Sequence, residues 1–321
     1  HPGSIPSLGR SSDTPIKHQR FSDLARVHIE VTGGVMDRQQ RRRSCDTDPL
    51  LYYGIDLNAG PGIYCEQGVP YLGTPERLAR LLVGRLPHVL FLFERHKKLY
   101  TALFREWLVK HYSRQPEEVL SLSDLPLPPL PPLGLNIQRG VPGIAAIVGN
   151  SGRNGQSVVA LCRSGIPYGS YGLLVHDPNG TPSPWVFDRL LGLSCMHRID
   201  VAIHCPTVAV KRVREYRLRH SDKGADKRTL AQMITGRKRY WWIQRPVGKH
   251  QWVWLFGANW SGFPDSELRR IGFVSTTSAE GRDLLEQLSL TKASLAAVLA
   301  NRTRRGEQAG VVTTATTGAG K

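Results

Sequence analysis

The chain has 321 residues and a formal net charge of +17 at pH 7, and 40% of its residues are hydrophobic. This composition indicates a folded chain with a sizeable core and argues against a fully disordered or fibrous protein. No apolar run is long enough to cross a bilayer, so we expect no membrane partner and a cytoplasmic location.

The excess of positive charge predicts a polyanionic partner. Lys and Arg outnumber Asp and Glu by 43 to 26, which is typical of proteins that bind nucleic acid. A cationic surface that only aids solubility is the alternative. We expect nucleic acid as the partner, with DNA ranked ahead of RNA, and leave open whether a second protein supplies target recognition.

Strands and helices are predicted to alternate along the chain. The expected strands are short apolar runs bounded by turn residues, and they cover residues 51–57, 88–94, 143–148, 171–175 and 199–205. The expected helices are amphipathic or follow helix-start signals, and they cover residues 21–43, 76–85, 96–112, 156–163, 184–193, a short segment ending at 234, and 282–299. A break of the first helix at Gly33-Gly34 is left open, and Thr74 is expected to cap the second helix.

An aromatic β-hairpin is predicted after the alternating elements, over 239–245 and 251–257, with Gly248 at its turn. Alternation of strands and helices favours a parallel sheet covered on both faces. We therefore expect an α/β fold, a doubly wound Rossmann-like sheet with a C-terminal antiparallel β-hairpin, which is the arrangement of class I methyltransferases.

One domain is expected over residues 19–300, and it includes a proline-rich loop at 121–135 and a basic insert at 211–228. Residues 1–18 and 301–321 are rich in small and polar residues, and we expect both to be disordered.

Polar residues follow the carboxyl ends of four predicted strands, where ligands bind in doubly wound sheets. They are Asp56, Asn58, Gly60 and Gly62 after the first strand, Glu94 after the second, Asn150 after the third, and Asp177, Pro178 and Asn179 after the fourth. Each position has a purely structural alternative: an acid can cap a turn or pair with a neighbouring base, and Asn suits turns. Their occurrence at consecutive strand ends favours one shared site.

These motifs resemble those of methyltransferases. The run 54–62 resembles the first motif of class I S-adenosylmethionine (SAM) methyltransferases, and Asp177-Pro178-Asn179-Gly180 resembles the Asp/Asn-Pro-Pro-Tyr motif of amino-methyltransferases. Together with Leu92-Phe93-Glu94 they look like the three-Cys-motif partner (TcmP) family, which are methyltransferase-like proteins of bacteria and phages. The likeness covers roughly residues 17–300 and implies a SAM-binding fold more than a particular reaction. Asn58 stands where that family has Phe.

The resemblance implies roles for these residues. The glycine turn would wrap the methionine part of SAM, Asp56 would hold its ammonium group, and Glu94 would accept the ribose hydroxyls. Asn150 would hold the adenine amine. Asp177 and the Pro178 carbonyl would accept hydrogen bonds from a target amine and so orient its lone pair. Gly180 replaces the aromatic ring that stacks on a flipped base, for which His176 or a tryptophan is a candidate substitute.

A basic run and several tryptophans form a second candidate surface. The basic residues are Lys211, Arg212, Arg214, Arg217, Arg219, Lys223, Lys227 and Arg228. The tryptophans that are candidates to stack on bases are Trp241, Trp242, Trp252, Trp254 and Trp260. For Trp252 and Trp254, which share one strand face, packing in the core is the favoured interpretation.

The cysteines give no sign of a metal or disulfide framework. The chain has five cysteines and no Cys-x-x-Cys pair, so a reducing compartment is the default. Cys195, Cys205, His197 and His204 match no standard metal-site spacing, and we expect no metal.

The sequence thus predicts a SAM-dependent methyltransferase that acts on nucleic acid, at an exocyclic amine of DNA. The alternative is a non-catalytic nucleic-acid-binding protein on a degenerate methyltransferase fold, which Gly180 favours. A third interpretation is a different reaction in the same cleft, such as nucleotide-dependent DNA modification.

Overall fold

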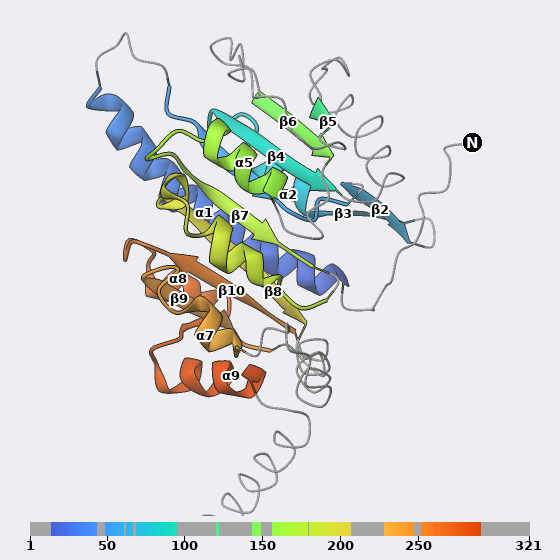
Figure 1. The fold of residues 1–321 in the computed structure, drawn as a ribbon, viewed down its shortest axis with the longest axis vertical. Helices are drawn as coiled ribbons and strands as arrows, with labels where there is room; N and C mark the ends of the chain where they lie inside the picture. Colours follow the sequence, from blue (N-terminus) through green and yellow to red (C-terminus); the bar gives the residue numbers. More distant parts are fainter. Residues whose placement is uncertain are drawn as a thin grey trace, which may run out of the picture.

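The computed structural model describes residues 14–43, 49–60, 62–66, 69–94, 120–121, 143–148, 156–178, 180–206, 228–246 and 252–289. Its centre is a nine-stranded sheet with the strand order β11-β9-β10-β8-β7-β1-β4-β6-β5 (Figure 1). The strands are β1 (Tyr52–Asp56), β4 (His88–Glu94), β5 (Leu120–Ser121), β6 (Gly143–Val148), β7 (Tyr171–His176), β8 (Ile199–Pro206), β9 (Tyr240–Gln244), β10 (Trp252–Ala258) and β11 (Phe273–Ser275).

The sheet is parallel from β5 to β8 and antiparallel beyond β8. β1 lies between β4 and β7 and pairs in parallel with both. β10 pairs antiparallel with β8 and with β9, and β9 pairs antiparallel with β11. The α/β class and the predicted C-terminal hairpin are therefore confirmed. A separate two-stranded sheet, β2 (Ile63–Glu66) with β3 (Val69–Leu72), lies between β1 and α2 in the chain.

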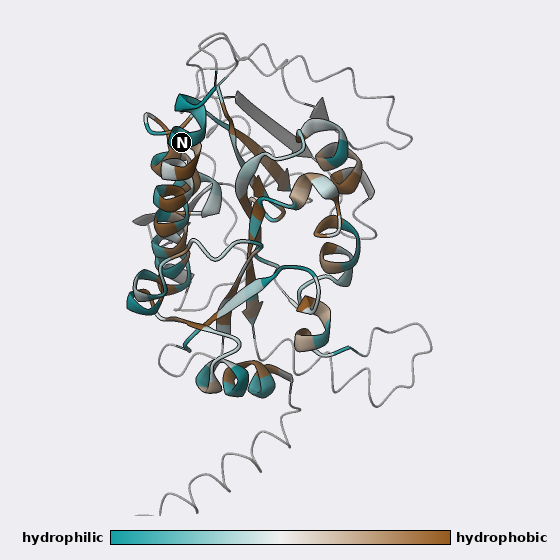
Figure 2. Ribbon diagram, turned by 90° about the vertical axis from the view of Figure 1, so that its left-hand side faces the viewer, coloured by the Kyte–Doolittle hydropathy of each residue, from teal (hydrophilic) through white to brown (hydrophobic). Residues whose placement is uncertain are grey.

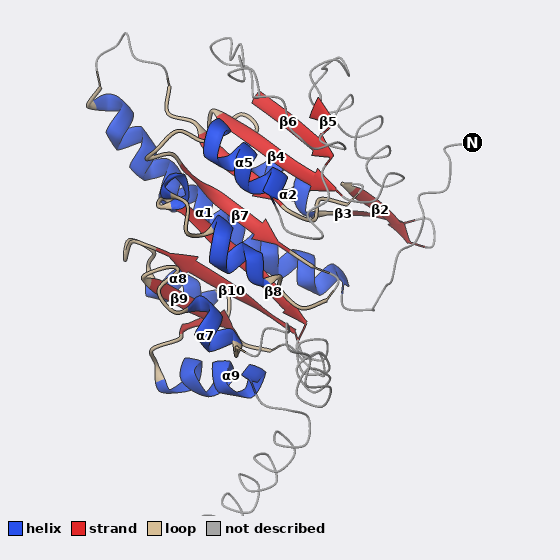
Figure 3. Cartoon of the chain, in the orientation of Figure 1, coloured by secondary structure: helices blue, strands red, loops and turns tan. Residues whose placement is uncertain are grey.

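Helices cover both faces of the sheet (Figures 1 to 3). They are α1 (Thr14–Arg41), α2 (Thr74–Leu82), α5 (Gln156–Gly165), the π-helix η3 (Val186–Leu190), the 3₁₀-helix η4 (Ser194–Met196), α7 (Leu230–Ile234), α8 (Asp265–Arg270) and α9 (Ala279–Ser289). Side chains of α1, α2 and α8 form one core cluster with the sheet. Side chains of α5, η3, α7 and α9 form a second cluster on the other face. None of the described helices is both long and apolar enough to cross a membrane.

The structure corrects the predicted start of the first helix and answers the question whether this helix breaks at Gly33-Gly34. α1 begins at Thr14, inside the segment 1–18 that we expected to be disordered, and runs to Arg41 without a break. A Cβ atom at Gly33 would lie 3.2 Å from the Leu86 side chain, so this glycine allows close packing instead of ending the helix.

Two further expectations need correction, and several elements were not predicted. Gly73, and not Thr74, caps α2, without a side-chain cap hydrogen bond. The single helix predicted over 184–193 is replaced by η3 and η4. The β2–β3 hairpin, α8 and β11 were not predicted, because these elements are short and lack a long periodic pattern. The predicted helix 96–112, the proline-rich loop 121–135 and the tail 301–321 lie outside the described residues.

The tryptophans of the hairpin belong to the core. Trp241, Trp242, Trp252 and Trp254 are all at most 8% exposed. The ring of Trp242 stacks on Phe256 at a centroid distance of 5.4 Å, which is typical of aromatic pairs in protein cores. The core interpretation is therefore confirmed for Trp252 and Trp254, and stacking of these four rings on bases is wrong as a prediction.

Candidate functional site

The glycine turn after β1 lies against the end of β4. Gly60 and Gly62 have φ angles of 62° and 76°, which side chains with a Cβ atom rarely adopt. The Ala59 N–H donates to the Phe93 carbonyl at 3.0 Å, and the Gly60 N–H donates to Glu94 Oε2 at 2.9 Å. Glu94 therefore fixes the backbone of the turn, a role that the sequence did not predict for it.

Three carboxyl groups converge at the carboxyl ends of three neighbouring strands. Asp56 ends β1 and is in register with Leu92 on β4 and Val175 on β7. Glu94 and Asp177 follow those two partners by two residues each, so both lie at the same sheet edge as Asp56. The predicted convergence of strand-end residues is present in the structure for these three acids.

Asp56 is completely buried, with 0% exposure. Its Oδ1 accepts a hydrogen bond from the Asn58 backbone N–H at 2.9 Å, whereas Oδ2 has no hydrogen-bond partner among the described residues. Burial raises the pKa of Asp56 to about 8, and the neighbouring Asp177 and Glu94 contribute in the same direction. The Asn58 hydrogen bond and Lys17 oppose this shift only in part.

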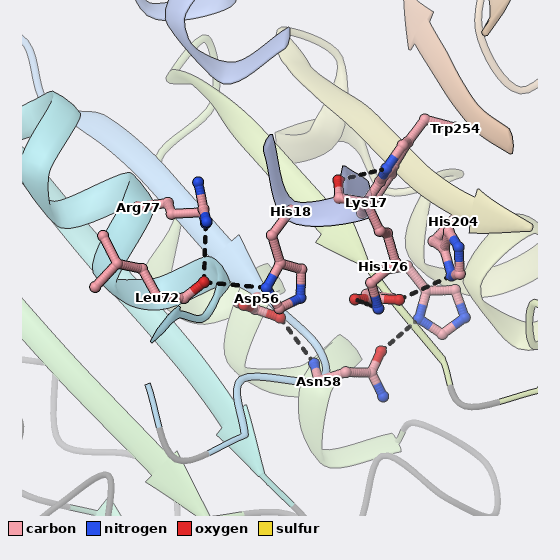
Figure 4. Close-up of polar contacts among 10 residues, drawn as sticks. Lys17, His18, Asp56, Asn58, Leu72, Arg77, His176, His204 and Trp254 are labelled. Carbon is pink, nitrogen blue, oxygen red and sulfur yellow. Dashed lines mark hydrogen bonds and ion pairs between the residues drawn. The ribbon is translucent and has the colours of Figure 1, made fainter. Parts of the chain in front are cut away.

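Asp177 has the opposite environment. Its Oδ2 lies 2.7 Å from Lys17 Nζ and its Oδ1 lies 2.9 Å from His204 Nδ1. Although burial disfavours the charged form, Lys17 and His204 hold the pKa of Asp177 well below its ordinary value. Asp177 is therefore a carboxylate with both oxygens in contact with basic groups. The Trp254 indole N–H donates to the Lys17 carbonyl at 3.3 Å and fixes the start of α1 (Figure 4).

A buried histidine connects the turn after β1 with the segment after β7. His176 Nδ1 lies 2.9 Å from Asn58 Oδ1, and His176 Nε2 accepts the Ser183 backbone N–H at 3.1 Å (Figure 4). Because Nε2 accepts, the ring proton resides on Nδ1 and donates to Asn58. Burial lowers the pKa of His176 to about 4, so the ring is neutral at pH 7.

A second buried histidine attaches α1 to the end of β3. His18 Nδ1 lies 3.0 Å from the Leu72 carbonyl oxygen, which also accepts from Arg77 Nε at 2.8 Å (Figure 4). Burial lowers the pKa of His18 to about 4. The first turns of α1 therefore cover this edge of the sheet through specific polar contacts.

The structure places some predicted site residues together and leaves others undescribed. Asp56, Asn58, Gly60, Gly62, Glu94, Asp177 and Pro178 belong to the described edge of the sheet, and Asn150 and Asn179 lie outside the described residues. The Oδ1 atom of Asn58 accepts from His176, and the cofactor contact of Asn58 stays a prediction. His176 is 3% exposed and cannot replace the missing stacking ring at Gly180.

The sequence did not identify Lys17, His18 or His204 as partners of this edge. Lys17 and His18 fell in a segment that we expected to be disordered, and His204 was considered only as a metal ligand. The one available signal for His204 is its place in a buried strand whose other residues, apart from Asp200, are apolar.

One basic residue of the candidate nucleic-acid surface, Arg228, belongs to the described residues. Arg228 donates to both carboxylate oxygens of Asp188, at 2.8 and 2.6 Å, and Arg237 donates to the same group at 2.8 Å. Arg228 is thus part of a partly exposed salt-bridge network with Asp188 and Arg237, and its phosphate contact stays a prediction. The remaining basic residues of the run, 211–227, lie outside the described residues.

No family model matches the sequence, and neither does any curated protein. Among solved structures, the chain is similar to the crystal structure of protein LPL1258 from Legionella pneumophila str. Philadelphia 1, which is described by the family model DUF519. Sequence identity is 14%, the TM-score is 0.39, and the match covers 78% of this chain and 90% of the other. This degree of likeness carries no conclusion about function.

Proposed function

We propose that this protein is a class I SAM-dependent methyltransferase that acts on an exocyclic amine of nucleic acid, with DNA as the expected substrate. The order of the strands carries the proposal. Numbering β1, β4, β6, β7, β8, β9 and β10 in chain order from one to seven gives the sheet order 3-2-1-4-5-7-6. This is the Rossmann order with an antiparallel last strand inserted before the sixth, the hairpin arrangement that class I methyltransferases have.

The site geometry supports binding of SAM at the edge formed by β1 and β4. The positive φ angles of Gly60 and Gly62 allow the backbone to approach a ligand closely. Asp56 offers a carboxyl oxygen that has no hydrogen-bond partner in the described part of the chain, and this oxygen suits an ammonium group. Glu94 stands at the end of the second strand, where ribose hydroxyls bind in nucleotide folds, and Asn150 is proposed for the adenine amine. The resemblance to the TcmP family is part of this proposal.

The environment of Asp177 suits a hydrogen-bond acceptor for the target amine. Because its pKa is held low, it is a carboxylate over the whole physiological range and accepts hydrogen bonds throughout. Together with the Pro178 carbonyl it would orient the amine lone pair toward the methyl group, so that catalysis consists mainly of positioning.

A non-catalytic nucleic-acid-binding protein on the same fold is the second candidate, and one observation favours it. Lys17 and His204 contact both oxygens of Asp177, so a target amine must share or replace one of these contacts. Gly180 adds no ring for stacking, and a Cβ atom there would meet nothing within 4 Å.

Isothermal titration with SAM tests the proposal first. We expect micromolar or tighter binding by the wild type and a loss of about 1–3 kcal/mol in Glu94→Ala, the range for a buried hydrogen bond to a charged group. Arg270→Ala is the matched control, because this exposed side chain pairs with Glu267 on the same helix, α8. Absence of SAM binding would reject the cofactor assignment.

Methyl transfer separates the two candidates. A tritiated-methyl assay on single- and double-stranded DNA, RNA and protein should label DNA with the wild type, and Asp177→Ala should abolish the label while SAM affinity is retained. Binding of SAM and of nucleic acid without any labelled product would support the non-catalytic candidate.

A further inference from the structure

The second carboxyl oxygen of Asp56 is buried without a partner. Asp56 has 0% exposure, and its Oδ2 forms no hydrogen bond with the described residues. A buried polar atom without a partner costs free energy, so each such atom needs an explanation, and a bound ligand or a catalytic role is one of them. This atom lies at the carboxyl end of β1, directly before the turn that contains Gly60 and Gly62.

The charges around Asp56 come from three elements, and most of them are negative. Glu94 on β4 and Asp177 after β7 both disfavour ionisation of Asp56, and Lys17 on α1 favours it. However, Lys17 Nζ is 2.7 Å from Asp177 and is therefore engaged with a different carboxylate. Among the described residues, no salt bridge to Asp56 is present.

We propose that Asp56 binds the ammonium group of a ligand by proton exchange. In the ligand-free protein Asp56 is a neutral carboxylic acid, and it releases its proton when the ammonium binds. The inference rests on the proposed function, which already places the ammonium of SAM at Asp56, and goes further because it makes binding release a proton. The exchange is balanced: the Asp56 carboxyl loses one proton to the buffer, and the resulting carboxylate pairs with the ammonium, which keeps its protons.

The direction of the pH dependence follows from linkage. The pKa of Asp56 in the free protein is about 8, so close to one proton, about 0.9, is bound there at pH 7. An ammonium that binds only the carboxylate must displace this proton. Below this pKa the affinity should rise with pH, by up to about tenfold per pH unit between pH 6 and 7.

Titration calorimetry in two buffers of different ionisation enthalpy measures the released protons. We expect the wild type to release close to one proton per SAM at pH 7, and Asp56→Asn to bind SAM more weakly, release almost none and show no rise in affinity between pH 6 and 7. The α-amino group of SAM itself titrates near pH 8, but it contributes equally to both proteins, so their difference isolates Asp56.

Two other ligands identify the group that displaces the proton. S-adenosylhomocysteine keeps the ammonium and lacks the sulfonium charge, so it should also release the proton. Methylthioadenosine lacks both charges and should release none. Equal proton release by the wild type and Asp56→Asn, or by methylthioadenosine and SAM, would overturn the inference. If the wild type binds SAM without this linkage, the inference fails and the proposed function stands; if it does not bind SAM, the proposed function itself fails.

The ligand-free protein gives an independent measurement. The unfolded chain ionises this carboxyl at pH 7, whereas the folded protein keeps it protonated, so the folded wild type is at a disadvantage that Asn removes. Asp56→Asn should therefore raise the melting temperature at pH 7, with a smaller effect at pH 4. A lower melting temperature of the variant at pH 7 would contradict a neutral Asp56.

Discussion

The contact between Lys17 and Asp177 connects the first turn of α1 to the end of β7, and its energetic weight can be measured. The two atoms are 2.7 Å apart, and the side chains are only 18% and 10% exposed. Removing one partner from such a pair leaves an uncompensated, largely buried charge, which costs about 3–5 kcal/mol in deeply buried pairs. Because both side chains keep some exposure, we expect about 3 kcal/mol for Asp177→Asn, which also weakens the contact with His204.

A double-mutant cycle with Lys17→Met isolates the pairwise term. We expect about 2 kcal/mol for Lys17→Met, because Asp177 keeps His204 as a partner, and a coupling energy of roughly 1–3 kcal/mol between the two substitutions. Urea unfolding followed by circular dichroism at pH 7 gives these values. The coupling should change little between low and high salt, since partly buried pairs are screened weakly.

The cycle also has a clear negative outcome. Losses that add within about 0.5 kcal/mol would show that the two groups do not interact energetically, and Lys17 would then not be what keeps Asp177 ionised. In the same variants, Asp177→Asn should leave SAM affinity nearly unchanged, since this residue is proposed to hold the target amine and not the cofactor.

Three further predictions concern packing, acid stability and the basic surface. Gly172→Ala should destabilise the fold by about 3 kcal/mol or more in urea unfolding, because its Cβ would lie 2.0 Å from a backbone carbonyl oxygen of β1. Gly54→Ala should cost about 1–2 kcal/mol, since its Cβ meets a leucine side chain that can shift. Equal losses of stability in the two variants would contradict this reasoning. His18 and His176 have pKa values of about 4, below that of histidine in the unfolded chain, so the unfolded state binds more protons between pH 6.5 and 4. The free energy of unfolding should therefore fall as the pH falls through this window, by up to roughly 3 kcal/mol for each histidine. Replacing both by Gln should remove this part of the pH dependence, and an unchanged profile would refute the assignment. Alanine substitutions within 211–227 should flatten the salt dependence of DNA binding, whereas Arg228→Ala should change it less, because Arg228 is already paired with Asp188. A flat salt dependence of the wild type would discard this surface.

The strand ends of the site could be predicted because one physical rule places them. Each buried parallel strand is a short apolar run followed by turn residues, and the carboxyl ends of parallel neighbours meet at one edge of the sheet. Asp56, Glu94 and Asp177 therefore converge as soon as the three strands are recognised. The hairpin of β9 and β10 was recognisable for a similar reason, from its alternating aromatic residues.

The partners of these acids could not be predicted, because they depend on tertiary packing. Lys17 lies 160 residues from Asp177 in the chain, and nothing in its local sequence specifies where the first turn of α1 will pack. His204 is adjacent to Asp177 only because β8 pairs with β7. The protonation of Asp56 depends on the absence of such a partner, which no sequence pattern encodes.

Asp56 and Asp177 show how one sheet edge can give two carboxyl groups different protonation states. They end neighbouring strands, yet one has an unpartnered buried oxygen and a raised pKa, and the other contacts Lys17 and His204 and has a lowered pKa. Pairs of titratable groups whose environments separate their pKa values indicate how the roles are divided. Asp177 is an acceptor at all times, whereas Asp56 becomes an acceptor only when a ligand cation arrives. If that cation is the ammonium of SAM, one positive charge replaces the departing proton of Asp56, so the net charge beside Asp177 stays the same and Asp177 remains an acceptor for the target amine whether or not the cofactor is bound.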